Sequence, residues 1–294
     1  MTAVAAVDVG TNTVRLLVCD DGRQLDRAQE ITRLGKGVDA SGRLDGESIR
    51  RSADAVARFV ARARKAGAAR IRIAGTSALR DAADADAFVT AVRDATALDV
   101  HILDGETEGR CAYRGATGWL PSDGAYVVCD IGGGSTELIT AANTISIDVG
   151  SVRVRERFLA SDPPTTDEVT AARAAITDAI FDSARSVVDG GEQLVGVAGT
   201  ITTLAALALE LDVYDSRRVH GSRLTRADID AWSRRLLAMP AGEIAAIGVV
   251  QLGREDVIGA GSLILSVVME VLEARDVVVS ERDILDGLVA ELLG

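Results

Sequence analysis

The sequence predicts an α/β protein in which two related domains flank a cleft, and three observations support this prediction. Strand patterns alternate with segments whose apolar residues recur at helical spacing. One strand–turn–strand unit near the N-terminus reappears in the middle of the chain. The chain of 294 residues also exceeds the usual size of a single domain. We therefore expect domains at residues 1–120 and 121–282, with a terminal helix at about 283–294 that joins the first domain.

The first half of the chain reads as short buried strands and amphipathic helices. Strands are expected at Ala3–Val9, Val14–Cys19, Ile71–Ala74 and Val100–Leu103. Helices are expected at Gly46–Ala66, Asp84–Ala95 and Thr107–Ala116. Asp45 is the expected N-cap of the first helix. The segment Trp119–Gly124 is rich in helix and strand breakers and is the expected crossing between the domains.

The second half repeats this alternation. A strand–loop–strand unit is expected at Ala125–Thr140, extended by Thr144–Val149. Thr165 and Glu168 fit a capping box before a helix, and the strand Leu194–Ala198 runs into another helix. The chain closes with helices, a strand at Asp276–Ser280 and a last helix from about Asp283.

Composition and charge argue against several classes of partner. The net charge of −12 disfavours binding to DNA or to an anionic membrane, and only 3% of residues are aromatic, too few for stacking single-stranded nucleic acid. Cys19, Cys111 and Cys129 lack metal-ligand spacing and are expected to be buried free thiols. No signal peptide and no apolar run of the ~20 residues that span a bilayer is visible, so we expect a cytoplasmic protein.

The repeated unit is the most informative feature of the sequence. Each copy is an apolar strand that ends in Asp, a tight turn of small residues and a second apolar strand. The two copies are Val7–Leu17 and Cys129–Ile139. Small residues let the backbone approach an anion, and consecutive N–H groups in a turn form an anion-binding nest. One such turn would be read as an ordinary hairpin that needs Gly, but two matched turns predict a phosphate site.

The two strand-end carboxylates, Asp8 and Asp130, require a cation if phosphate is the ligand. They would repel a phosphate that touched them, so we expect Mg²⁺ between carboxylate and phosphate, bound directly or through water. Neither turn is a Walker A loop or a dinucleotide fingerprint. A third element, Val197–Thr202, runs from strand to helix. Its Gly199 and Thr200 either present helix N–H groups to a phosphate or simply start the helix.

Five segments in a fixed order carry a resemblance to a known family. They are Ala6–Leu16, Ile31–Gly35, Gly75–Ala82, Asp104–Arg110 and Asp130–Leu138. The paired hairpins resemble the actin, Hsp70 and sugar-kinase superfamily of ribonuclease H-like domains. The whole set resembles the exopolyphosphatase and guanosine-pentaphosphate phosphatase (Ppx/GppA) family. The resemblance is to a short form, without the C-terminal helical region similar to HD phosphohydrolases that other members carry.

The resemblance implies a role for each motif residue. The family's catalytic Glu corresponds to Glu108, as general base for the attacking water, although from the residues alone Glu106 ranks equal to it. Asp130, Asp8 and Glu137 are the expected metal ligands, with Mg²⁺ as cofactor and Mn²⁺ as the alternative. The expected phosphate-binding residues are Gly10, Thr11, Asn12, Thr13, Arg15, Arg80, Gly132, Gly133, Gly134, Ser135, Thr136, Gly199 and Thr200. Arg33 and Arg153 are further candidate cations, although a surface ion pair explains each of them as well.

The function expected from these residues is that of an exopolyphosphatase, which hydrolyses the terminal phosphoanhydride of inorganic polyphosphate, chiefly short chains. The alternative is hydrolysis of the 5′ γ-phosphate of guanosine pentaphosphate. A kinase of the sugar-kinase superfamily and a non-catalytic sensor of polyphosphate or alarmone are less favoured readings. The resemblance also suggests a homodimer. In the last helix Asp283–Gly287 stands where the family usually has Gly-Leu-Arg-Glu-Gly, so the expected Arg is replaced by Leu285.

Overall fold

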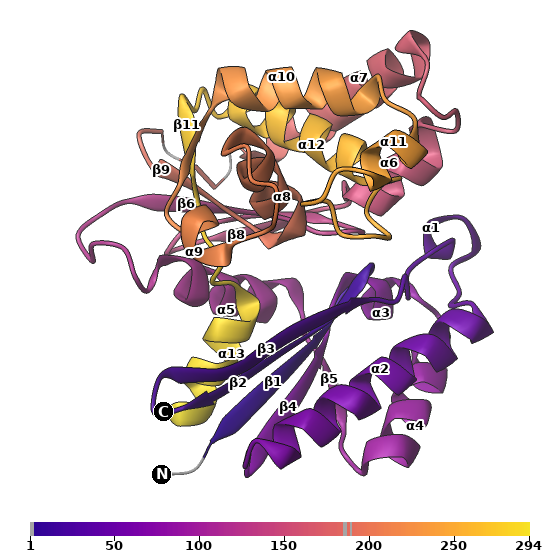
Figure 1. The fold of residues 1–294 in the computed structure, drawn as a ribbon, viewed down its shortest axis with the longest axis vertical. Coiled ribbons are helices and arrows are strands. Elements are labelled where there is room, and N and C mark those ends of the chain that lie inside the picture. Colours follow the sequence, from indigo (N-terminus) through magenta and orange to yellow (C-terminus); the bar gives the residue numbers. More distant parts are fainter. Residues whose placement is uncertain (1–2, 185–186, 189) are drawn as a thin grey trace. The chain divides into compact units, whose positions relative to one another are not determined.

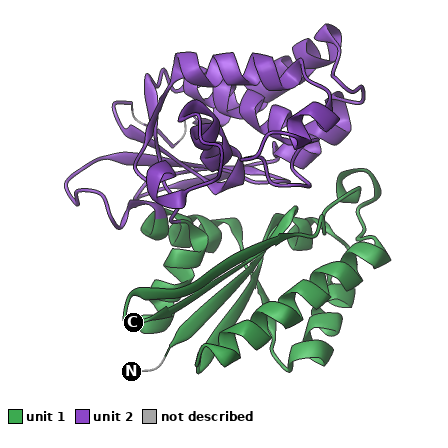
Figure 2. Cartoon of the chain, viewed as in Figure 1, with its two compact units in different colours: residues 1–115, 283–294 green, residues 116–282 purple. Residues whose placement is uncertain are grey.

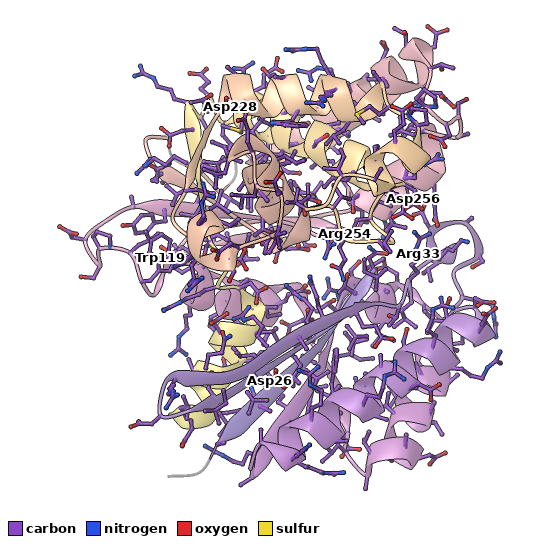
Figure 3. The ribbon with its side chains drawn as sticks, in the orientation of Figure 1. Asp26, Arg33, Trp119, Asp228, Arg254 and Asp256 are labelled. Carbon is purple, nitrogen blue, oxygen red and sulfur yellow. The ribbon has the colours of Figure 1, made fainter. Side chains whose placement is uncertain are left out.

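The computed structural model describes residues 3–184, 187–188 and 190–294, and the chain divides into two compact units (Figure 2). Unit 1 comprises Met1–Gly115 and Asp283–Gly294, and unit 2 comprises Ala116–Arg282. The segment Trp119–Gly124 lies just beyond the boundary. Trp119, labelled in Figure 3, donates its indole N–H to Ser280 Oγ (3.2 Å). Its ring packs on His220 with ring centroids 4.2 Å apart, so both side chains have structural partners in unit 2.

Unit 1 is built on a five-stranded sheet with the order β3-β2-β1-β4-β5. The strands are β1 (Val4–Val9), β2 (Thr13–Asp20), β3 (Arg23–Ile31), β4 (Arg70–Gly75) and β5 (Val100–Ile102). The first three form an antiparallel meander, and β4 and β5 continue the sheet parallel to β1. Every residue of β1 is buried, as expected for a central strand that is covered on both faces.

The helices of unit 1 follow the strands and cover the sheet (Figure 1). They are α1 (Val38–Ser41), α2 (Gly46–Lys65), α3 (Ser77–Asp81), α4 (Ala85–Thr96), α5 (Gly105–Thr117, whose last residues belong to unit 2) and α13 (Ile284–Leu293). Helix α2 packs on α4 and on β1 and β2, while α13 packs on β1 and β2. The carboxylate of Asp45 accepts a hydrogen bond from Ser48 N–H (2.9 Å), which confirms the predicted N-cap of α2.

Unit 2 is built on a six-stranded sheet with the order β10-β11-β9-β6-β7-β8. The strands are β6 (Tyr126–Ile131), β7 (Thr136–Ile139), β8 (Thr144–Ile147), β9 (Gln193–Val197), β10 (Arg223–Thr225) and β11 (Asp276–Val279). Strands β6, β7 and β8 form an antiparallel meander, and β9 and β11 continue it parallel to β6. Strand β10 pairs antiparallel with β11 at the edge.

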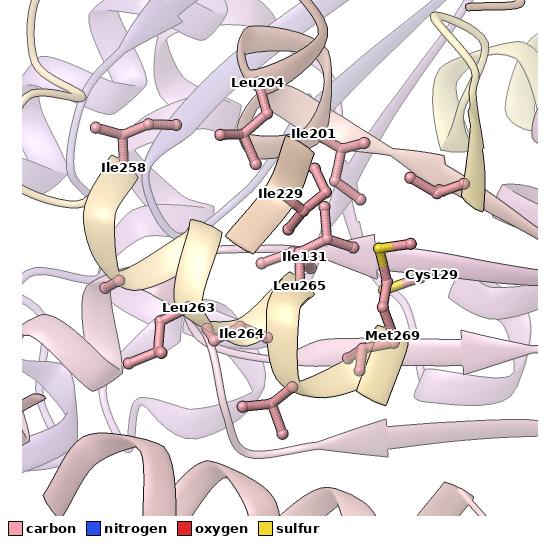
Figure 4. Packing of buried hydrophobic residues seen from close by; sticks show 14 of the residues in the cluster. Cys129, Ile131, Ile201, Leu204, Ile229, Ile258, Leu263, Ile264, Leu265 and Met269 are labelled. Atoms are coloured by element: carbon pink, nitrogen blue, oxygen red, sulfur yellow. The ribbon is translucent and has the colours of Figure 1, made fainter. Parts of the chain in front are cut away.

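Helices supply most of the core of unit 2. They are α6 (Ser151–Phe158), α7 (Thr166–Ala184), α8 (Ala198–Ala208), α9 (Ser216–Val219), α10 (Arg226–Leu237), α11 (Ala241–Ala245) and α12 (Ile258–Val271). Residues 258–269 of α12 are buried on every side, and Figure 4 shows Leu265 and Met269 of this helix packed near Cys129 and Ile131 of β6. The predicted capping box is present, because Thr165 N–H donates to the Glu168 carboxylate (2.7 Å) and Glu168 N–H donates to Thr165 Oγ1 (3.2 Å).

The two units repeat one topology, an antiparallel meander extended by parallel strands from its first strand. This arrangement confirms the predicted α/β class and the actin and sugar-kinase-like fold. The three cysteines are buried free thiols, as predicted. Strands β3 and β10 are absent from the predicted set; β3 carries mostly exposed and half-buried residues, so it lacks the apolar pattern of a buried strand. In the described ranges we find no helix with the length and apolar character needed to cross a bilayer.

Candidate functional site

The first loop, residues 10–13, turns the chain from β1 into β2. Gly10 N–H donates to the Thr13 carbonyl (3.0 Å), which closes a tight turn. A Cβ on Gly10 would lie 3.2 Å from that carbonyl oxygen, closer than most real Cβ contacts, so the turn favours glycine. The side chains of Thr11, Asn12 and Thr13 are largely buried. The structure therefore gathers the predicted phosphate-binding residues of this hairpin in one compact turn.

The segment after β3 holds the first loop from one side. Thr32 and Arg33 donate their backbone N–H groups to the Asn12 carbonyl (3.0 and 2.9 Å), and Gly35 N–H donates to the Thr11 carbonyl (2.8 Å). Arg33 adopts the left-handed region with φ 52°, a strained conformation of the kind found at functional sites. The N–H groups of Thr11 and Asn12 make no hydrogen bond within the described residues. They form a nest that an anion can occupy.

The second loop, residues 132–135, has the same geometry between β6 and β7. Gly132 N–H donates to the Ser135 carbonyl (2.9 Å), and a Cβ on Gly132 would lie 3.1 Å from that oxygen. The N–H groups of Gly133 and Gly134 have no hydrogen-bond partner in the described part of the chain. The sequence repeat is therefore also a repeat of backbone hydrogen bonding, and both turns offer consecutive N–H groups to an anion.

The start of helix α6 supports the second loop. Val152 and Arg153 donate their backbone N–H groups to the Gly133 carbonyl (2.9 and 3.1 Å), and Arg153 Nε donates to the Gly134 carbonyl (2.8 Å). A Cβ on Gly150 would lie 2.4 Å from the Gly133 carbonyl atoms. Residue 150 must therefore be glycine for α6 to approach the loop this closely. Arg153, a predicted candidate cation, thus helps to hold the loop itself.

The carboxylate at the end of β1 is neutralised by its cross-strand neighbour. Asp8 lies opposite Arg15, and Asp8 Oδ2 accepts hydrogen bonds from Arg15 Nε (2.9 Å) and Nη2 (2.6 Å). Burial raises the pKa of Asp8 above its usual range, while the charge of Arg15 lowers it. Arg15 also donates to the carboxylate of Asp283. The predicted phosphate-binding Arg15 is therefore engaged by two carboxylates.

In the second hairpin the cross-strand neighbour of the strand-end Asp is an acid instead of an Arg. Asp130 at the end of β6 lies opposite Glu137 of β7, a side chain that is only 3% exposed. Like charges directly opposite one another on an antiparallel pair are destabilising. Glu137 Oε1 accepts a hydrogen bond from Ser146 Oγ (2.7 Å). The hydroxyl of the predicted ligand residue Thr136 donates to the Val149 carbonyl, so it already has a structural partner.

Glu108 lies in the first turn of α5, where the chain leaves β5. The helix begins at this point because the Asp104 carboxylate accepts a hydrogen bond from Thr107 N–H (2.7 Å). The side chain of Glu108 is 14% exposed and is paired with Arg80 Nη1, which also donates to the Leu103 carbonyl (2.9 Å). Glu106, two residues earlier, is exposed. The structure therefore distinguishes two acidic residues that rank equal in the sequence.

Glu108 shares one electrostatic environment with the first hairpin. Burial raises the pKa of Glu108 above its usual range; the Arg80 guanidinium opposes this shift, and the charge of Asp8 adds to it. Arg15 lowers the same pKa. Such a carboxyl, kept from solvent and oriented by one guanidinium, has the properties of a general base.

The third predicted phosphate element, Gly199 and Thr200, opens helix α8. Ala198, the first residue of α8, adopts φ 68°. A Cβ on Gly199 would lie 1.9 Å from Arg254 Nη1, so the guanidinium lies directly against the first turn of the helix. Figure 3 shows Arg254 and its neighbour Asp256 in the loop that precedes α12. Sequence reasoning missed Arg254, because no motif or periodicity links this loop to a residue 55 positions earlier in the chain.

The carboxylates present fit a divalent cation that is bound mainly by water and substrate. Within residues 3–184, 187–188 and 190–294, no group of three or more His, Cys, Asp or Glu side chains is arranged to hold a metal ion. Mg²⁺ needs only one or two carboxylates when substrate phosphates and waters complete its shell. Asp8 Oδ1 is buried without a hydrogen-bond partner, and the Asp130–Glu137 pair combines two negative charges. Oxygen donors of this kind suit a hard cation.

Each unit contains part of the predicted set of functional residues. Unit 1 holds the first loop together with Asp8, Arg15, Arg80 and Glu108. Unit 2 holds the second loop together with Asp130, Glu137, Gly199 and Thr200. Within unit 1, Arg80 donates a hydrogen bond to Glu108, and Arg15 donates one to Asp8. Binding of phosphate by both arginines stays a prediction from the sequence.

Comparison with known proteins gives consistent matches along the chain. The sequence model of the Ppx/GppA phosphatase family matches residues 20–294. The chain is 38% identical over 317 residues to Exopolyphosphatase 2 of Mycobacterium tuberculosis (strain ATCC 25618 / H37Rv), covering 100% of this chain and 99% of that protein. It is 27% identical over 299 residues to a guanosine-5'-triphosphate,3'-diphosphate pyrophosphatase of Photobacterium profundum, covering 98% of this chain and 59% of that protein.

A solved structure agrees with these sequence matches. The crystal structure of an exopolyphosphatase-like protein superposes with a TM-score of 0.93 at 32% sequence identity. The superposition covers 99% of this chain and 98% of that chain. The similarity therefore extends over both units.

Proposed function

We propose, from the premise that the chain belongs to the Ppx/GppA phosphatase family, that it is an exopolyphosphatase. The substrate is inorganic polyphosphate, chiefly short chains, and the bond hydrolysed is the terminal phosphoanhydride. The observation that carries this proposal is the Arg80–Glu108 pair of unit 1, a largely buried carboxyl whose pKa is raised by burial and by the charge of Asp8. A carboxyl with a raised pKa can accept a proton near neutral pH.

Glu108 supplies the proton acceptor in the proposed reaction. It takes one proton from a water molecule as the water oxygen forms a bond to the terminal phosphorus. The bond between that phosphorus and the bridging oxygen breaks, and the electron pair leaves with the shortened chain. Arg80 orients the Glu108 carboxylate through the contact between them and is itself anchored on the Leu103 carbonyl. No nucleophilic Cys or His is required, because phosphoryl transfer depends mainly on positioning and charge stabilisation.

The two loops supply backbone donors for phosphate oxygens. The N–H groups of Thr11, Asn12, Gly133 and Gly134 have no hydrogen-bond partner in the described residues. Such donors bind an anion without adding a full positive charge. The N-terminal turn of α8, with Arg254 against it, offers a further anion site in unit 2.

A divalent cation completes the proposed site. In unit 2, Asp130 and Glu137 are the residues that would hold Mg²⁺, with Mn²⁺ as the alternative. In unit 1, Asp8 Oδ1 is an oxygen donor that would suit the same kind of ion. When bound, the ion would neutralise phosphate oxygens and stabilise the charge that develops during transfer. The two acidic residues that face each other in the second hairpin are the strongest support for this proposal.

Hydrolysis of guanosine pentaphosphate at its 5′ γ-phosphate is the second candidate, because the same residues would perform it. Its support is the relative from Photobacterium profundum, whose name describes action on guanosine-5'-triphosphate,3'-diphosphate. The homodimer and the cytoplasmic location predicted from the sequence stay predictions.

A substrate panel tests the proposed function. Purified protein is incubated with tripolyphosphate, longer polyphosphate, guanosine pentaphosphate and ATP, each with Mg²⁺ and with Mn²⁺, and released phosphate is measured. We expect the highest kcat/KM with short polyphosphate. Preferential turnover of guanosine pentaphosphate would favour the second candidate, and binding of polyphosphate without turnover of any substrate would contradict an enzymatic role.

A further inference from the structure

Asp283, the residue that caps the terminal helix α13, is the starting point for an inference about the first hairpin. Its Oδ1 accepts a hydrogen bond from Leu285 N–H (3.0 Å), and its own N–H donates to the carboxylate of Asp286 (3.1 Å). These bonds form a capping box. The backbone of Asp283 is therefore held by the helix that it begins.

Two glycines bring this helix start against α5. A Cβ on Gly115 would lie 1.9 Å from the Asp283 carbonyl oxygen, and a Cβ on Gly287 would lie 2.0 Å from the Cys111 carbonyl oxygen. Both distances are far below any real Cβ contact, so the two helices meet backbone to backbone. Together with the contacts of α13 to β1 and β2, this close approach fixes where the Asp283 side chain lies.

The second carboxylate oxygen of Asp283 is directed at the first hairpin. Asp283 Oδ2 accepts a hydrogen bond from Arg15 Nη1, while Arg15 Nε and Nη2 donate to Asp8 Oδ2. The guanidinium thus bridges two carboxylates that lie 93% or more out of solvent. Asp283 uses different oxygens for the cap and for the bridge, so the two roles can be separated by substitution.

The bridge leaves an excess of negative charge beside the first loop. Asp8 and Asp283 together carry two negative charges and Arg15 carries one positive charge, so the three side chains sum to −1. Asp8 and Arg15 alone would be neutral. A phosphate chain that enters the first loop brings further negative charge, which the additional carboxylate repels through a medium of low effective dielectric. Asp283 also occupies Arg15 Nη1, a charged donor that could otherwise form a hydrogen bond with phosphate.

We propose that Asp283 is a positioning residue: it occupies Arg15 beside Asp8 and so limits how tightly the first loop binds a polyanionic phosphate chain. The proposal rests on the proposed function, since it assumes that phosphate chains are the ligand. It concerns binding rather than the proton transfer assigned to Glu108. The effect is therefore expected in KM and in the dissociation constant rather than in kcat.

The test compares Asp283→Asn with Asp286→Asn. Asn is as good an N-cap as Asp, so Asp283→Asn keeps the cap and loses the charge. Asp286→Asn removes one charge from the same helix at a residue that pairs with Arg27, and the Asn oxygen can still accept the hydrogen bond from Asp283 N–H. We expect KM for tripolyphosphate to fall about fivefold in Asp283→Asn and to be unchanged in Asp286→Asn. Asp283→Ser, also a good cap, serves as a second variant if Asp283→Asn does not fold.

Calorimetric binding of tripolyphosphate separates this proposal from the proposed function. If wild-type protein does not release phosphate, the proposed function fails, yet the dissociation constants of the variants still test the role of Asp283. Tighter binding by Asp283→Asn, with wild-type affinity in Asp286→Asn, supports it. Unchanged or weaker binding by Asp283→Asn, or the same change in both variants, overturns it.

Discussion

The two hairpins share one backbone geometry and an Asp near the end of the first strand, but the residue that faces this Asp on the second strand has opposite charge in the two units. In unit 1, Asp8 faces Arg15, and in unit 2, Asp130 faces Glu137. The turns that follow close with the same hydrogen bond, from Gly10 to Thr13 and from Gly132 to Ser135. A common scaffold for anions is thus combined with an ion pair in one unit and with two acids in the other. The hairpins therefore differ in the charge of the residue that faces the strand-end Asp, not in the geometry of the turn.

The largest effect is expected on kcat when the proposed base Glu108, which lies outside both hairpins, is replaced. Glu108→Gln removes the proposed base while leaving both loops in place, so kcat for phosphate release should fall by about 10²–10⁴-fold. Glu106→Gln is the matched control, because Glu106 is exposed and lies in the same turn of α5. Equal rates for wild type and Glu108→Gln would show that the hairpins act without this base.

The second largest effect is expected on the Mg²⁺ requirement, at the strand-end carboxylates Asp8 and Asp130, whose cross-strand neighbours differ in charge. Asp130→Asn should raise the Mg²⁺ concentration for half-maximal activity by about 10–100-fold, the range seen when groups around a metal are removed. Asp8→Asn should raise it less, because Arg15 already neutralises Asp8. Titration of activity with Mg²⁺ measures both values. A larger rise in this Mg²⁺ concentration for Asp8→Asn than for Asp130→Asn would contradict the expected difference between the two hairpins.

The supports of the two loops differ as well, and substitution of glycine distinguishes them. Gly150→Ala places a Cβ against backbone atoms of Gly133, whereas Gly35→Ala meets the methyl group of Thr11 at 2.4 Å. We expect both to destabilise the protein by about 1–3 kcal/mol, as overpacking does, with Gly150→Ala the more severe. Thermal unfolding measures the change.

A second substitution tests whether the clash with the Thr11 methyl group is the cause of the destabilisation in Gly35→Ala. Thr11→Ser removes the methyl group that Gly35→Ala would touch, so it should restore part of the stability of that variant and none of the stability of Gly150→Ala. Failure of Thr11→Ser to improve Gly35→Ala would show that the contact with Thr11 is not the cause.

The smallest effect is a shift in the pH dependence of activity, and it is expected from Glu108 and Arg80 of unit 1. Glu108 must be deprotonated to act as a base, and burial raises its pKa above the ordinary value of 4.5. Activity should therefore be lost on acidification at a higher pH than for an exposed Glu. Arg80 stabilises the charged form, so Arg80→Gln should move the acid limb of kcat/KM to still higher pH. A limb that stays in place or moves to lower pH in Arg80→Gln would contradict this pairing.

Local patterns predicted the elements of the fold and the two hairpins, because burial leaves a periodic record in the sequence. The strand around Val7 and the helix that Asp45 caps are examples. Strand β3 leaves no such record, since it is mostly exposed or half-buried and reads as a polar segment. Its existence depends on pairing with β2 rather than on its own residues.

Residue identities predicted the chemistry of the candidate site but not its partners. The binding of phosphate by Arg15 stays a prediction, and the sequence gives no sign of the contacts that Arg15 makes with Asp8 and with Asp283, which lies 268 positions away. The contact of Arg254 with the start of α8 likewise could not be predicted from the sequence. Such contacts arise from tertiary packing, which brings distant segments together without a local signature.

The most direct test of the account is the fate of water oxygen during hydrolysis. Wild-type protein is incubated with short polyphosphate and Mg²⁺ in ¹⁸O-labelled water, and the products are analysed by mass. The account predicts that orthophosphate is released one unit at a time and that each released phosphate carries one labelled oxygen. Release of unlabelled phosphate in the first turnovers, before chains are degraded to pyrophosphate, would contradict water attack at the terminal phosphorus, as would internal fragments or absence of hydrolysis.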